Sequence, residues 1–173
     1  AHVPLHTTAN YDGQLTNQRG IHQFWESRLP ELFAEARYNF FVGQANYIEQ
    51  PRRYYWDIIH NSNRLVINVL EKEKLVSTQF EADKKYCLET KNGIVVQKTC
   101  PEYAEAFHNA LNGMVETQMR NAILALGSVW YSAWIDAGQP DLNYFKEDKE
   151  VVVKDTLPNI MTDAKMLGRD EGN

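Results

Sequence analysis

Two side chains are spaced as metal ligands on one helix face. His22 and Glu26 lie four residues apart in a segment with helical periodicity, so their side chains leave the same face about one turn apart. His6 precedes a polar loop that can return it to that face. Two imidazole nitrogens and one carboxylate oxygen are a frequent zinc set, which leaves a fourth position for water or substrate. By spacing alone, His6, His22 and Glu26 are candidate ligands of a zinc ion.

The same spacing has a simpler interpretation. A histidine and a carboxylate four residues apart often form only a surface contact worth a few tenths of a kcal/mol. The protein would then be a helical binding or scaffold domain with an incidental or structural metal site. His2 is expected to be exposed rather than ligating. His60 and His108 have no partner at metal-ligand spacing, so we expect them to be structural or solvent-facing.

Helical periodicity dominates the rest of the chain. Apolar residues recur on one helix face in residues 18–37, 51–79 and 101–137. Pro30 is expected to end or kink the first helix. In residues 86–100, Asn92-Gly93 separates two β-prone runs, which is the strongest short-range hairpin signal. We therefore predict an all-α, multi-helix fold with long helices and one small β-hairpin insertion.

The length of 173 residues suits a single helical domain, which typically buries roughly 70% of the surface of the unfolded chain. Within 1–173 we expect a ligand-bearing loop at 1–20 and a charged C-terminal extension at 141–173. The first residues read as the middle of a longer sequence. The chain is therefore expected to be the C-terminal part, a fragment, of a larger helical enzyme.

Composition excludes several function classes. A net charge of −5 and a pI near 5.5 argue against a large basic surface for nucleic acid. No apolar run approaches the roughly 18 residues of a membrane span, so no span is expected. The sequence contains neither a phosphate-cradling glycine-rich loop nor a Gly-x-Ser-x-Gly elbow, so it indicates neither nucleotide-driven nor serine-hydrolase chemistry.

Cysteines and tryptophans add secondary expectations. Cys87 and Cys100 flank the predicted hairpin, and both a disulfide of an exported protein and two reduced thiols fit this spacing. Trp25 lies beside the ligand pair and is the aromatic residue that we expect to contact substrate. Trp130 and Trp134 are one helical turn apart, and packing between helices is their expected use.

The ligand segments resemble a known superfamily. Pro4-Leu5-His6, a polar loop, and then Gly20-Ile21-His22-Gln23-Phe24-Trp25-Glu26 are similar, in order, to motifs of the zinc-dependent phospholipase C and single-strand-specific nuclease superfamily. The resemblance implies that His6, His22 and Glu26 bind one zinc ion of a trinuclear cluster. It also implies a metal-bridging aspartate six residues before His6, one position before Ala1, and further ligands in a missing N-terminal half. The helix containing Trp130 and Trp134 resembles the C-terminal helix of that superfamily, less specifically.

The resemblance implies a zinc-dependent phosphodiester hydrolase. A disulfide between Cys87 and Cys100 would also indicate export, to the periplasm or by secretion. The zinc cluster of such a hydrolase would bind the phosphodiester and generate hydroxide from a bound water. The substrate is a phospholipid or a single-stranded nucleic acid, and Glu26, Asn10 and Gly20 slightly favour the phospholipase C type. No catalytic residue beyond the metal ligands is identified. With one zinc site, the chain alone is expected to be nearly inactive.

Overall fold

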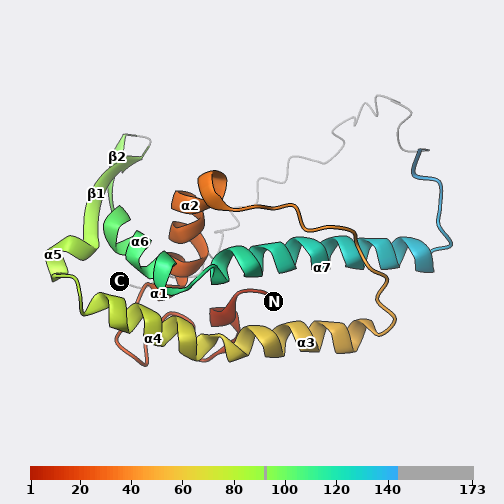
Figure 1. The fold of residues 1–173 in the computed structure, drawn as a ribbon, viewed down its shortest axis with the longest axis horizontal. Coiled ribbons are helices and arrows are strands. Elements are labelled where there is room, and N and C mark those ends of the chain that lie inside the picture. The colour runs from red at the N-terminus through yellow and green to blue at the C-terminus, as the bar shows by residue number, and fades with distance from the viewer. Residues whose placement is uncertain (92, 144–173) are drawn as a thin grey trace, which may run out of the picture. The chain divides into compact units, whose positions relative to one another are not determined.

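The computed structural model describes residues 1–91 and 93–143 and shows a mostly helical chain with one small antiparallel sheet (Figure 1). The expectation of a helical fold with a hairpin is confirmed, although the sheet makes the term all-α only loosely apt. Ala1–Gln139 form one compact unit. Most of the predicted extension at 141–173 lies outside the described residues. In the part that is described, no helix is long and apolar enough to cross a membrane.

The N-terminal region consists of a short turn, a loop and one continuous helical run. A 3₁₀ turn, η1, spans Pro4–Thr7. The helical run begins at Ile21, not at residue 18, and comprises α1 (Ile21–Gln23), η2 (Phe24–Arg28) and α2 (Leu29–Arg37). Pro30 does not end this run. In η2 the backbone N–H of Leu29 donates to the Phe24 carbonyl, five residues earlier, and such a wide turn gives the proline ring space within a helix.

The second predicted helix is divided in two. Helices α3 (Pro51–Arg64) and α4 (Val66–Ser77) meet at Leu65, and a short helix, α5 (Ala82–Lys85), follows. Both long helices lie within the predicted span of residues 51–79. Pro51 occupies the first turn of α3, where its missing N–H costs no intrahelical hydrogen bond.

The predicted hairpin is confirmed. Strands β1 (Tyr86–Lys91) and β2 (Ile94–Thr99) pair in antiparallel register, from Tyr86 opposite Thr99 to Lys91 opposite Ile94. This register leaves a two-residue connection at the predicted Asn92-Gly93, of which Asn92 lies outside the described residues. A disulfide joins Cys87 to Cys100, so of the two possibilities left open by the sequence, the structure has the disulfide. It ties the base of the hairpin to the start of the next helix.

The third predicted helix, 101–137, is also two helices, and the expectation of one continuous helix is wrong. Helix α6 covers Pro101–Ala110 and α7 covers Met114–Asp136. Asn112 and Gly113 between them have φ of 49° and 77°. This left-handed conformation ends a right-handed helix, and asparagine and glycine adopt it most readily.

The hydrophobic core lies where the two ligand-bearing segments meet α4, α6 and the start of α7. It is made of thirteen buried side chains: Leu5, Ile21, Phe24, Trp25, Leu29, Phe33, Val69, Val76, Tyr103, Ala104, Phe107, Leu111 and Val115. Phe24 packs against Tyr103 and Phe107, with ring centroids 5.3 and 4.9 Å apart. The helix that carries His22 and Glu26 is thus fixed by its apolar face.

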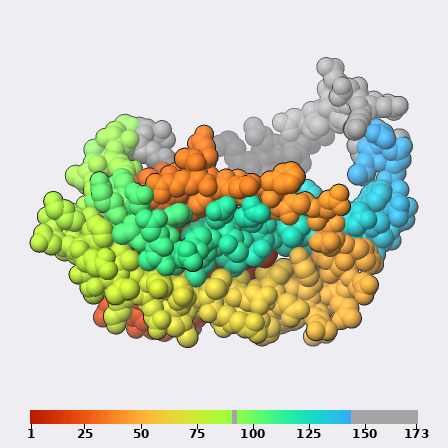
Figure 2. Space-filling view, in the orientation of Figure 1, coloured from red at the N-terminus to blue at the C-terminus, as the bar shows by residue number. Residues whose placement is uncertain are grey.

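The predicted packing of Trp130 between helices is wrong, since this side chain is 68% exposed. The buried side of this part of α7 carries small residues, including Ser128 and Ser132. Their hydroxyls accept hydrogen bonds from the backbone N–H groups of Asn46 and Ile48, at 3.1 and 2.8 Å. The extended segment 38–50 therefore lies along α7 (Figures 1 and 2), where small side chains allow a close backbone approach.

Candidate metal centre

The three predicted ligands converge on one point. The Nε2 atoms of His6 and His22 are 2.8 Å apart, and Glu26 Oε2 lies 3.2 Å from the first and 2.7 Å from the second. An ion bound at about 2.0–2.1 Å needs its ligand atoms roughly 3 Å apart. These side chains form a possible metal-binding triad, and it is the only such group of histidine, cysteine and carboxylate residues among the described residues.

The triad is open to solvent on one side. The side chains of His6, His22 and Glu26 are 43, 24 and 40% exposed. A structural zinc site is usually closed by four protein ligands, whereas a catalytic site has three and leaves one position for water or substrate. The triad has three converging ligand atoms and an open face, so its ligand set is that of a catalytic zinc site rather than a closed structural one.

His6 is positioned by the packing of its neighbours. Pro4 and Leu5 are buried, with Leu5 fully inside the core, so the next side chain in η1 points outward. The Thr7 hydroxyl closes the turn by donating to the Pro4 carbonyl at 2.7 Å, and Asn63 of α3 donates from its side-chain amide to the Thr7 carbonyl at 2.9 Å. Helix α3 thus holds the turn in place.

Glu26 lies inside the wide turn η2 (Phe24–Arg28). In a regular α-helix the ring of Pro30 would press on the carbonyl of Glu26, four residues earlier. The wide turn relieves this contact by including one more residue than a regular helical turn. Turns of this type are frequent at functional sites. Pro30 is therefore accommodated within the helical run, one turn after Glu26, and does not end it.

The Asp12 carboxylate holds the start of α1, a role that the sequence did not predict. Asp12 Oδ1 accepts hydrogen bonds from the backbone N–H groups of Gly20 and His22, at 3.0 and 3.4 Å. An anionic acceptor at a helix start satisfies N–H groups that have no intrahelical partner. Tyr11 places its ring edge-on to the His22 imidazole, with centroids 5.7 Å apart. Because both residues lie about ten positions before their partners, no short-range motif predicts these contacts.

The ligand-bearing loop folds back on itself around Gly13. The Gln18 backbone N–H donates to the Gly13 carbonyl at 2.9 Å. Asn10 is buried, accepts from the Leu15 N–H at 2.7 Å and donates to the Thr16 hydroxyl at 3.0 Å. Asn10 therefore acts inside the loop. These bonds return the chain to the helix that carries His22.

The structure corrects the expectation for Trp25. Its side chain is 3% exposed and belongs to the hydrophobic core, and its indole N–H is buried without a hydrogen-bond partner among the described residues. The cause is helical spacing: Trp25 and Leu29 are one turn apart, and both are buried, whereas His22 and Glu26 are partly exposed. A direct contact with substrate does not fit this position.

The remaining histidines do not join the triad. His2 is partly buried rather than exposed, and burial together with the N-terminal amine lowers its pKa. Burial also lowers the pKa of His108, which stacks on Tyr38 and lies 3.0 Å from its hydroxyl. His60 is exposed. His108 and His60 are thus structural and solvent-facing, as expected, whereas the expectation of exposure for His2 is wrong.

Comparisons with known proteins do not extend this description. No protein-family model, no curated protein and no solved structure matches the chain.

A glycine substitution tests whether the folded loop builds the site. A Cβ at Gly13 would lie 2.3 Å from the Gln18 carbonyl oxygen in a backbone with φ of +74°. We expect Gly13→Ala to cost about 1–2 kcal/mol from the left-handed backbone and about 1–3 kcal/mol more from overpacking. Chemical unfolding measures this loss of stability. We also expect a loss of zinc affinity, which zinc titration measures.

Gly43→Ala is the matched control. Gly43 has a similar φ of +86°, but a Cβ there meets nothing within 4 Å, so only the backbone cost is expected and zinc affinity should not change. Equal effects of the two substitutions on stability and zinc binding would show that the loop closure at Gly13 does not support the site.

Proposed function

We propose that this chain supplies one zinc site of a metal-dependent phosphodiester hydrolase, with His6, His22 and Glu26 as the ligands. The observation that carries the proposal is the convergence of their three ligand atoms within about 3 Å of one another on an open surface. Zinc suits two imidazoles and one carboxylate. The resemblance of the two ligand segments to the zinc-dependent phospholipase C and nuclease superfamily supports the phosphodiester as substrate.

His6, His22 and Glu26 would hold the zinc ion, which when bound would supply Lewis-acid chemistry toward a phosphodiester and a water molecule. The chain's own residues orient the ion: Asp12 holds the start of the helix, and η1 holds His6. Since one ion lacks the multi-metal clamp on the attacking and leaving oxygens, we expect slow hydrolysis by this chain alone.

The proposed substrate is a phospholipid head-group diester in preference to a single-stranded nucleic acid. Glu26 as the carboxylate ligand supports this preference, because the resemblance associates glutamate with the phospholipases and aspartate with the nucleases. The net charge of −5 also disfavours a polyanionic substrate. We further propose that the protein acts outside the cytoplasm, where disulfides such as Cys87–Cys100 persist.

Zinc binding is the first test. The purified chain should bind about one equivalent of zinc, measured by elemental analysis and calorimetric titration. Loss of an outer partner of a metal ligand costs roughly 10–100-fold in affinity, so loss of a direct ligand in His22→Ala or Glu26→Gln should cost at least about 100-fold. A metal-free wild-type chain, or unchanged affinity in both variants, would contradict the proposal.

Two exposed residues outside the triad provide matched controls. His60→Ala and Glu71→Gln change the same residue types on α3 and α4 and should leave zinc affinity unchanged. Circular dichroism and melting of the metal-free variants establish that all of them fold.

Hydrolysis is the second test. Zinc-loaded chain should cleave bis(p-nitrophenyl) phosphate slowly, faster than the same concentration of free zinc, and should lose this activity on chelation and in His6→Ala but not in His60→Ala. Faster cleavage of p-nitrophenylphosphorylcholine than of a single-stranded oligonucleotide would support the phospholipase type, and the reverse order the nuclease type. Full activity in His6→Ala would sink the proposed role of the triad.

A further inference from the structure

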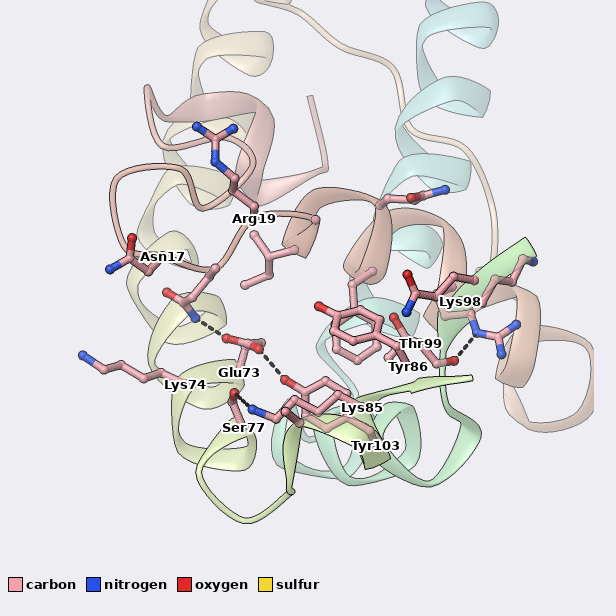
Figure 3. A pocket seen from close by; sticks show the side chains of 18 of the residues that line it. Asn17, Arg19, Glu73, Lys74, Ser77, Lys85, Tyr86, Lys98, Thr99 and Tyr103 are labelled. Atoms are coloured by element: carbon pink, nitrogen blue, oxygen red, sulfur yellow. Dashed lines mark hydrogen bonds between the residues drawn. The ribbon is translucent and has the colours of Figure 1, made fainter. Parts of the chain in front are cut away.

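A cavity lies behind the helix that carries His22 and Glu26. Its volume is about 820 Å³, and it is bordered by the end of the N-terminal loop, the helical run from Ile21, α4, the hairpin and α6 (Figure 3). Ile21 and Phe24 line it, whereas His6, His22 and Glu26 do not. Small-molecule sites commonly enclose about 300–1,000 Å³. The cavity is therefore large enough for a ligand and separate from the metal centre.

A hydrogen-bonded network forms one wall of this cavity. The Glu73 carboxylate is 9% exposed and accepts hydrogen bonds from the Tyr103 hydroxyl and the Gln18 amide. Beside it, Lys85 donates from Nζ to the Ser77 hydroxyl at 2.7 Å, as Figure 3 shows. Each carboxylate oxygen has two lone pairs, so Glu73 retains acceptor capacity for a hydroxyl group of a ligand.

The lining has an excess of positive charge that its own carboxylates do not neutralise. Arg28 and Lys98 are engaged by Glu31, and Arg28 also by Glu89. A second group of basic residues has no carboxylate partner among the described residues: Arg19, Lys74 and Lys85. The two carboxylates of the lining, Glu31 and Glu73, are bound to other residues. Figure 3 shows Arg19 and Lys74 with their charged ends pointing away from the Glu73 network, and such long side chains can turn toward a bound anion.

Neutral polar groups and one aromatic face complete the lining. Gln23, Gln97 and Ser27 border the cavity, and the side chain of Tyr86 is 51% exposed. Figure 3 places Tyr86 between the Glu73 network and Thr99. A polar wall of this kind suits hydroxyl groups, and an exposed aromatic face suits the C–H face of a sugar ring.

We propose that this cavity binds a small sugar-like molecule that carries one anionic group, a phosphate or a carboxylate. Its hydroxyl groups bond to Glu73 and the neighbouring amides, its ring lies on Tyr86, and its anion is held by Arg19 and Lys74. The site requires neither the metal triad nor hydrolysis, so it stands independently of the function proposed above.

Binding to metal-free protein tests the site with three probes that share one pyranose ring: glucose 6-phosphate, glucuronate and glucose. Calorimetry gives the affinity, and amide NMR shifts at Lys85 and Tyr86 give the location. Saturable binding of one or both anions is expected, with glucose weaker by at least about tenfold, because a hydrogen bond to a charged group is worth roughly that factor. Binding of the phosphate alone assigns a sugar phosphate, and binding of glucuronate alone a sugar acid.

The double variant Arg19→Gln/Lys74→Gln should weaken anion binding by at least about tenfold. Its matched control, Arg52→Gln/Lys72→Gln, removes the same charges outside the cavity and should change the affinity less than about twofold. His22→Ala should bind the probes as the wild type does, which separates this site from the zinc site. No saturable binding of either anion, equal binding of glucose, or equal losses in the two double variants would overturn the proposal.

Discussion

The Glu73 carboxylate is the constraint on which the two candidate sites depend. It is buried between Tyr103 of α6 and Gln18 at the end of the N-terminal loop. Gln18 also donates to the Leu70 carbonyl of α4 at 2.8 Å. A buried carboxylate is tolerated only when donors replace its lost hydration. These contacts therefore attach the loop to the helical core just before His22.

Burial and the neighbouring Glu73 carboxylate both raise the pKa of Tyr103. The sign of this shift means that the phenol keeps its proton, and hence its hydrogen bond to Glu73, to higher pH than a free tyrosine does. The same contacts form one wall of the cavity, so a single buried network supports both that cavity and the helix that carries His22 and Glu26.

The sequence predicts the residues of the triad better than it predicts the contacts that position them. His22 and Glu26 follow from helical spacing, and the hairpin follows from Asn92-Gly93, because both are short-range signals. The return of His6 depends on Asp12, Gly13 and Gln18, whose contacts span five to fifty-five residues and have no local pattern. The resemblance indicated that His6 belongs to the set, but not how the loop brings it there.

Other differences between expectation and structure have local causes that periodicity does not reveal. An apolar stripe continues through Asn112-Gly113, yet the left-handed backbone there separates α6 from α7. Trp130 follows the helical period of the apolar residues, but the segment 38–50 binds to the serine face of α7 instead. Trp25 lies next to Glu26 in sequence, but its side chain is buried in the core. Periodicity thus identifies helices, whereas breaks and partner faces depend on long-range packing.

The central claim is that one zinc ion is bound by two imidazoles and one carboxylate with a position left for solvent. X-ray absorption spectroscopy of the zinc-loaded protein tests it most directly. We predict nitrogen and oxygen neighbours at about 2.0–2.1 Å, scattering from two imidazole rings, and the loss of one ring in His6→Ala. A spectrum without imidazole scattering, or one that His6→Ala leaves unchanged, would contradict the account.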